Sequence, residues 1–278
     1  TSSPATFLRH GQILCSIPQM QHSIGETLIS VSNNGQQYSS STSAYTFYPQ
    51  ASVTSVSPSS GPVHGGTIVN VFGTGFVNNT VHSCQFGDTV VPATFLHSTQ
   101  TQCETPSNFN ENATLEVSIT NNGQNFASSV ASFEYAAVTS VSHVTPRSGH
   151  NSGGTVLHVH GKNFKGTVKL LYCAFNFTTT QAAVFVSDTE IRCVLPSYSN
   201  MQGGSVMLEI TTNGVEFVAG GPDLSIQVHE AETVEYLEPS RGTITGGLDV
   251  LVWGSNFQSS PTLSCIFGKD IAVKASWI

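Results

Sequence analysis

Apolar and polar residues alternate along three short segments of the chain, 67–73, 155–161 and 248–254. Successive side chains of a β-strand point to opposite faces, so a period of two predicts strands with one buried face. Aligned on the glycine pair that precedes them, the three segments carry apolar residues at the same two positions: Val69 and Val71, Leu157 and Val159, Val250 and Val252. We expect these positions to face the core, because the opposite face varies between the segments.

Each alternating segment belongs to a longer repeat. A Pro-x-x-Gly motif begins it at Pro58, Pro146 and Pro239, and a Gly-Gly pair follows. A spacing of about 90 residues between these prolines is that of a whole small domain rather than of one solenoid turn. The chain therefore carries tandem domains.

A turn that ends in phenylalanine follows each alternating strand. Gly75, Asn163 and Asn256 precede these phenylalanines, and we expect them to supply a positive φ. Cys-x-Phe and Cys-x-x-Pro segments come next. Asn-Gly pairs at 122–123 and 213–214 then predict a closing hairpin in each complete repeat.

In this order, the Pro-x-x-Gly, Gly-Gly-Thr, alternating strand, Gly-x-Gly/Asn-Phe, Cys-x-Phe and Cys-x-x-Pro motifs resemble the IPT/TIG family of Ig-like domains. The resemblance covers essentially the whole chain and implies an all-β fold of tandem Ig-like β-sandwich repeats. Very short linkers, such as 50–52 and 136–138, predict that the repeats are arranged as a rod. The family includes plexin-like and fibrocystin-like cell-surface proteins, Rel-type transcription factors and secreted carbohydrate-active enzymes, so the resemblance specifies a fold rather than a function.

Aligning the motifs divides the chain into four parts. Residues 1–50 match the back half of a repeat, 51–136 and 137–229 are complete repeats, and 230–278 match a front half. Two explanations of the half repeats stay open. The chain is a slice of a longer array, or the front half of one copy joins the back half of the next.

The six cysteines could be reduced core residues, metal ligands or disulfides. No Cys-x-x-Cys motif is present, which argues against zinc. The spacing within each complete repeat favours disulfides between Cys84 and Cys103 and between Cys173 and Cys193, and hence an oxidising, extracellular location. Cys15 and Cys265 have no partner in their own half repeats and are free or join separate chains.

Three Asn-x-Ser/Thr sequons start at Asn78, Asn112 and Asn176. The repeat alignment puts all three at turns beside strands, where attached glycans would be accessible. A chain this rich in Asn, Ser and Thr also forms sequons by chance, so glycosylation remains an expectation.

Phe72, His160 and Trp253 fall at one equivalent outward position of the three alternating strands. An aromatic ring there could stack on a glycan or on a neighbouring repeat, or it could simply lie under a loop. His158 and His160 share a strand face, but their counterparts in the other repeats could not bind a metal. We therefore interpret both histidines as surface residues and expect no metal site.

The chain has nine Lys and Arg against seventeen Asp and Glu, a formal net charge of −8, which excludes a basic surface for nucleic acid. No apolar run is long enough to be a membrane-spanning helix. Asp188 and Glu190 are the nearest acidic pair, but no counterpart of the pair occurs in the other complete repeat. We expect neither an enzyme nor a cofactor.

These observations together predict a structural repeat segment of an extracellular fibrous or filament-forming glycoprotein. Its partners would be neighbouring repeats or copies of the same chain, with covalent glycans. Two alternatives remain, the stalk of a cell-surface adhesion receptor and an accessory carbohydrate-binding module of a secreted enzyme.

Overall fold

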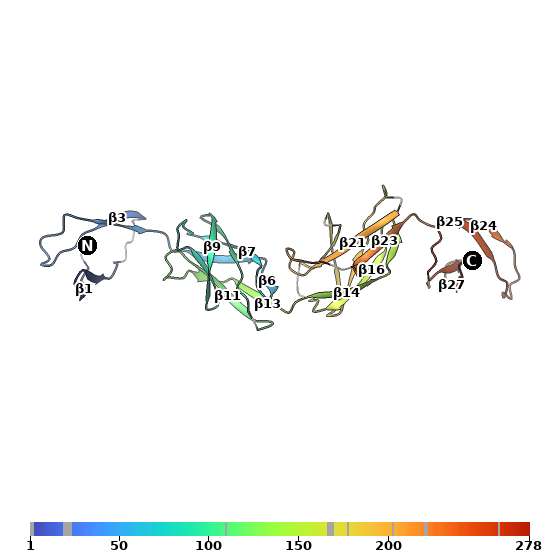
Figure 1. Ribbon diagram of the computed structural model, residues 1–278, viewed down its shortest axis with the longest axis horizontal. Coiled ribbons are helices and arrows are strands. Elements are labelled where there is room, and N and C mark those ends of the chain that lie inside the picture. Colours follow the sequence, from blue (N-terminus) through green and yellow to red (C-terminus); the bar gives the residue numbers. More distant parts are fainter. Residues whose placement is uncertain are drawn as a thin grey trace. The chain divides into compact units, whose positions relative to one another are not determined.

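The computed structural model describes residues 3–18, 24–108, 110–165, 170–176, 178–201, 203–219, 222–260 and 262–278. Strands are the regular elements of these residues, apart from one short 3₁₀ helix, η1 (Pro222–Leu224) (Figure 1). The all-β, Ig-like fold predicted from the sequence is confirmed.

The chain divides into two compact units. The first comprises Thr1–Ser57, Ile68–Ser107 and Thr114–Phe133, and the second comprises Pro58–Thr67, Asn108–Ala113 and Glu134–Ile278. The repeat 137–229 therefore lies wholly in the second unit, whereas the repeat 51–136 contributes residues to both units.

The repeat 51–136 forms a single hydrogen-bonded path of nine strands, in the order β12-β5-β7-β10-β9-β8-β11-β13-β6. Their bounds are β5 (Ser52–Ser57), β6 (Ser60–Pro62), β7 (Ile68–Thr74), β8 (Ser83–Phe86), β9 (Thr89–His97), β10 (Gln100–Glu104), β11 (Thr114–Thr120), β12 (Ser128–Ser129) and β13 (Ser132–Ala136). The long strand β9 pairs with β8 through residues 89–92 and with β10 through residues 93–97. It therefore passes from one layer of the sandwich to the other.

Buried apolar side chains of this repeat come from both layers. Val69 and Val71 of β7 are fully buried, as the alternating pattern predicted. Other buried core residues of the repeat include Val53, Cys84, Phe86, Cys103, Val117, Ile119, Phe133 and Tyr135. The Phe86 and Phe133 rings meet edge to face, with their centroids 5.9 Å apart.

The repeat 137–229 has the same plan, but its counterpart of β9 is broken. Its strands are β14 (Ser140–Thr145), β15 (Ser148–His150), β16 (Val156–Lys162), β17 (Tyr172–Phe175), β18 (Thr179–Ala182), β19 (Val184–Ser187), β20 (Glu190–Val194), β21 (Gly203–Thr211), β22 (Phe217–Ala219) and β23 (Ser225–His229). β18 pairs with β17 in one sheet and β19 pairs with β20 in the other. The interruption between them separates a four-stranded sheet, β14-β16-β20-β19, from a sheet built on β15-β23-β21-β17-β18.

One apolar cluster fills the space between these two sheets. Leu157 and Val159 of β16 are fully buried in it, again on the predicted face. Leu208 and Ile210 of β21 contribute from the other sheet. Because each sheet buries one face against the other, this repeat is a sandwich with its own core.

Residues outside the two complete repeats form two-stranded sheets. Their strands are β1 (Ala5–Arg9), β2 (Gln12–Cys15), β3 (Gly25–Ile29), β4 (Ser43–Phe47), β24 (Thr233–Glu238), β25 (Leu251–Ser255), β26 (Ser264–Phe267) and β27 (Ile271–Lys274). Phe7 of β1 is 72% exposed, and Leu28 of β3 is 66% exposed.

The glycine that ends each alternating strand allows close packing. A Cβ atom on Gly73 would overlap the carbonyl oxygen of Ser52 and would lie 2.7 Å from Cζ of Phe76. Phe76 itself is 3% exposed, so the phenylalanine after the turn closes the end of the core. A Cβ atom on Gly161 would likewise overlap the carbonyl oxygen of Ser140 and would lie 2.8 Å from Cζ of Phe164.

The turn between this glycine and the phenylalanine has the predicted backbone conformation. Gly75, Asn163 and Asn256 have φ angles of 75°, 64° and 62°. Glycine and asparagine adopt this left-handed region at the lowest cost, which explains why these residue types recur there.

Both predicted Asn-Gly turns reverse the chain. In the second repeat, β21 and β22 form an antiparallel hairpin in which Oδ1 of Asn213 accepts hydrogen bonds from the backbone of Val215 and Glu216. In the first repeat the segment after the turn forms an isolated antiparallel β-bridge with the strand before it, between Phe126 and Thr120. The chain then continues into β12, which pairs with β5 in parallel.

Both predicted disulfides are present. Cys84 of β8 is joined to Cys103 of β10, and Cys173 of β17 is joined to Cys193 of β20, with Cα atoms 6.3 and 6.1 Å apart. All four cysteines are buried. Since β17 and β20 belong to different sheets, the second disulfide links the two layers across the core.

A buried histidine forms a polar cluster inside the first repeat. His82 is 4% exposed; its Nδ1 lies 3.1 Å from Oδ1 of Asn121, and its Nε2 lies 3.1 Å from Oγ1 of Thr101. The Asn121 amide also donates to the carbonyl oxygen of Gly75. Burial lowers the pKa of His82, and the hydrogen bond with Asn121 opposes this shift.

We expect the Cys173→Ala, Cys193→Ala double variant to lower the free energy of unfolding of the second repeat by about 3 kcal/mol, because the disulfide restricts the unfolded chain. Hydrogen exchange followed by mass spectrometry measures this as lost amide protection in β17 and β21. The Cys84→Ala, Cys103→Ala double variant is the matched control and should affect β8 and β11 instead. Unchanged protection of β17 and β21 in the first variant would contradict the prediction.

Stability of the first repeat should depend on pH through His82. Because the pKa of His82 is lowered in the folded protein, the unfolded chain takes up the proton first as the pH falls below about 6.5. The free energy of unfolding therefore decreases as the pH drops from 7.5 to 5. Hydrogen exchange of β8 and β11, corrected for intrinsic exchange rates, measures the decrease.

In the His82→Gln variant we expect a lower free energy of unfolding at pH 7.5 and a weaker dependence on pH. His97→Gln, which changes an exposed histidine of the same repeat, is the control and should retain the wild-type dependence. Equal slopes in the wild type and in His82→Gln would contradict the assignment.

Candidate functional site

The outward aromatic residues each face a residue of the neighbouring strand in the same sheet. Antiparallel pairing places Phe72 opposite Ser55, His160 opposite His143 and Trp253 opposite Tyr236. In all three cases the register shifts just before the facing residue, which marks a β-bulge. The equivalence inferred from the sequence thus has a structural basis in a shared bulge.

Two of these pairs are stacked rings. The His143 and His160 rings have centroids 4.6 Å apart and planes inclined by 18°. The Tyr236 and Trp253 rings have centroids 5.4 Å apart and planes inclined by 10°. Tyr236 is 51% exposed and Trp253 is 48% exposed, so this pair presents a largely accessible aromatic surface.

His158, on the same face of β16 as His160, is paired with an acidic residue. Its Nδ1 lies 2.8 Å from Oε1 of Glu190, and Nε of Arg192 lies 3.8 Å from the same oxygen. The hydrogen bond from His158 lowers the pKa of Glu190, and the nearby positive charges add to the effect. Glu190 thus anchors a small surface cluster with His158 and Arg192.

All three sequon asparagines lie between strands. Asn78 follows β7 and Asn112 precedes β11, and both are exposed. Asn176 lies between β17 and β18 and is half-buried; its Oδ1 accepts a hydrogen bond from the backbone of Met207. Phe177, the middle residue of that sequon, lies outside the described residues.

Cys15 and Cys265 form no disulfide within this chain. Cys15 ends β2 and is exposed, while Cys265 is in β26 and is half-buried. The motif alignment makes Cys265 the equivalent of Cys84, and Cys15 the equivalent of Cys103. In the complete repeat these two positions are disulfide-bonded.

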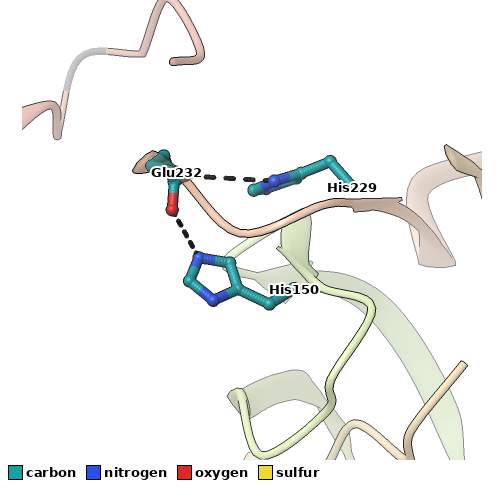
Figure 2. Close-up of side chains that lie close together, drawn as sticks. All are labelled: His150, His229 and Glu232. Atoms are coloured by element: carbon teal, nitrogen blue, oxygen red, sulfur yellow. Dashed lines mark ion pairs between the residues drawn. The ribbon is translucent and has the colours of Figure 1, made fainter. Parts of the chain in front are cut away.

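A further cluster brings together residues that the sequence analysis did not single out. His150 at the end of β15, His229 at the end of β23 and Glu232 beyond it converge at one edge of a sheet (Figure 2). Nε2 of His150 lies 2.7 Å from Oε2 of Glu232, and Nδ1 of His229 lies 3.9 Å from Oε1 of Glu232. The two histidines are about 80 residues apart in the sequence, so no local motif of the kind used to recognise metal sites could have indicated the cluster.

Within the described parts of the chain, no helix has both the length and the apolar character needed to cross a membrane.

Comparison with known proteins finds curated relatives that are much longer than this chain. Human fibrocystin-L is 25% identical over 212 residues, and mouse fibrocystin-L is 25% identical over 207 residues. These alignments cover 76% and 74% of this chain but only 5% of either relative's length. Among solved structures, the full extracellular region of plexin A4 (domains 1 to 10) is 20% identical, with a TM-score of 0.43, over 74% of this chain and 18% of the plexin chain.

The IPT/TIG domain family matches residues 51–135 and again residues 139–229, which together make up more than half of the sequence. These two ranges contain the two disulfide-bonded sandwiches. The chain therefore belongs to the IPT/TIG domain family and carries two such domains in tandem.

Proposed function

We propose that this chain is a structural repeat segment of an extracellular fibrous or filament-forming glycoprotein, linked head to tail with neighbouring repeats or chains. The observation that carries the proposal is the tandem of two IPT/TIG domains, each with a buried disulfide. A disulfide stabilises each domain by restricting its unfolded state, and disulfides of this kind are typical of proteins outside the cell.

Short connections between the repeats support a stiff array. β13 ends at Ala136 and β14 begins at Ser140, so three residues separate the two repeats. β23 ends at His229 and β24 begins at Thr233, which again leaves three residues. Three residues span at most about 10 Å, which restricts the relative motion of adjacent repeats.

The two free cysteines support linkage beyond this segment. Cys265 and Cys15 occupy the two positions that are bonded to each other in a complete repeat. In the proposed assembly each of them pairs with the complementary cysteine in the other half of its own repeat, which is supplied either by a continuous array or by another copy of the chain.

Non-reducing electrophoresis of material isolated from its source, with thiols alkylated during extraction, tests this proposal. We expect either one very long chain or a ladder of species that collapses to a single short chain on reduction. The ladder would assign Cys15 and Cys265 to bonds between chains, and the long chain would assign them to a continuous array. A short monomer under both conditions, with free Cys15 and Cys265, would contradict the head-to-tail assembly.

The three sequons support the glycoprotein assignment. We expect glycans at Asn78 and Asn112, which are exposed, and lower occupancy at Asn176, because its side chain is half-buried and hydrogen-bonded to Met207. Enzymatic release of N-glycans converts each occupied asparagine to aspartate, which peptide mass spectrometry localises.

The variants Asn78→Gln and Asn112→Gln should each lose one glycan. Asn79→Gln is the control, because it changes the neighbouring asparagine and preserves the sequon of Asn78. Unmodified asparagine at all three positions in secreted protein would contradict the assignment.

Among the alternatives, a carbohydrate-binding module is favoured by the exposed Tyr236 and Trp253 rings. The rings stack on each other, however, so one face of each is already covered, and the equivalent pair in the first repeat is Ser55 and Phe72. A receptor stalk would use the same tandem repeats below a separate ligand-binding domain. We prefer the structural role, and we propose no catalytic activity for this segment.

A further inference from the structure

We propose that His150, His229 and Glu232 form a binding site for a divalent transition-metal ion, best suited to Zn²⁺, at the end of the second IPT/TIG domain. One ligand atom from each of these residues lies within 4.8 Å of the others, and they are the only group of three or more such side chains among the described residues. The proposal is independent of the fibrous role proposed above.

The backbone holds the two histidines side by side. β15 and β23 are parallel neighbours, and their register pairs His150 directly with His229. Just beyond this pair, the backbone N–H of Asn151 donates a hydrogen bond of 2.8 Å to the carbonyl oxygen of His229. Both imidazoles therefore lie at the ends of neighbouring strands, and Figure 2 shows the contact of each with Glu232.

Glu232 supplies the third ligand from the connection that follows β23. Its carboxylate already contacts both histidines, at 2.7 Å from Nε2 of His150 and 3.9 Å from Nδ1 of His229. Tetrahedral ligands of zinc lie on the order of 3.3 Å from one another, since each is about 2.0 Å from the ion. The cluster needs only a small adjustment of side chains, and the glutamate, which is partly exposed, is free to make it.

Binding exchanges hydrogen bonds for metal bonds. Nδ1 of His229 lies 2.9 Å from the carbonyl oxygen of Glu230, and coordination through Nδ1 replaces this bond. The ion also replaces the contact between His150 and Glu232. Water completes the coordination, since all three side chains are partly exposed to solvent.

The ligand types select the metal. Two imidazole nitrogens and one carboxylate oxygen suit Zn²⁺, whereas Ca²⁺ and Mg²⁺ prefer sites made of oxygen. Two neutral imidazoles and one carboxylate leave a net positive charge on the bound ion. The acidic character of the chain, with a formal net charge of −8, favours the binding of a cation.

The fold itself does not require these residues. At the same register of the first repeat, β6 and β13 pair Pro62 with Ala136, neither of which can bind a metal. The side-chain cluster is therefore particular to the second repeat. Because Glu232 belongs to the three-residue connection before β24, a bound ion would tie this connection to the sheet edge and reduce its mobility.

Isothermal titration of the 278-residue chain with Zn²⁺ tests the site. Cys15 and Cys265 are alkylated beforehand, because free thiols also bind zinc. We expect one site per chain, which millimolar Ca²⁺ does not displace, and increased amide protection in residues 225–238 by hydrogen exchange.

The variants His150→Gln, His229→Gln and Glu232→Gln should each weaken binding at least roughly tenfold. The matched control is His158→Gln, which changes a histidine of the same repeat that pairs with Glu190 instead. Circular dichroism and unchanged amide protection in β17 and β21 verify that each variant is folded. Absence of binding in the wild type, or equal loss of affinity in His158→Gln, would overturn the proposal.

Discussion

Successive side chains of a strand point to opposite faces, and in the two complete repeats each layer of the sandwich buries one face against the other layer. Val69 and Val71 of β7 and Leu157 and Val159 of β16 occupy that face and are fully buried. A register slip of one residue would move all four into solvent, so the burial of these side chains holds the strand register in place. The other features of each repeat depend on this register.

The register also places the cysteines. Cys84 and Cys103 fall on the buried face of β8 and β10, and Cys173 and Cys193 fall on the buried face of β17 and β20. They come within bonding distance because the two layers pack together, and the bond then restricts the unfolded chain. Packing and covalent linkage therefore stabilise the same arrangement.

The outward face is less constrained, and its residues differ between repeats. Ser55 and Phe72, His143 and His160, and Tyr236 and Trp253 share one place beside a β-bulge but have different chemistry. A similar difference occurs at the ends of β15 and β23. The two histidines of the metal site proposed for the second repeat lie there, at the positions that Pro62 and Ala136 occupy in the first repeat. Repeats with one fold can thus carry different surface chemistry, which is why membership of the family does not specify a function.

Local features of the sequence determined the strands, the buried face, the positive φ at Gly75, Asn163 and Asn256, and the disulfide pairs. These depend on short-range periodicity, on the conformational preferences of single residues and on motifs that recur within each repeat. The tertiary structure alone decided that Glu190 pairs with His158 and that His150, His229 and Glu232 converge. Those groupings depend on which distant strands become neighbours and in which register. Pairing of β15 with β23 brings together residues about 80 positions apart, and no local pattern in the sequence encodes that contact.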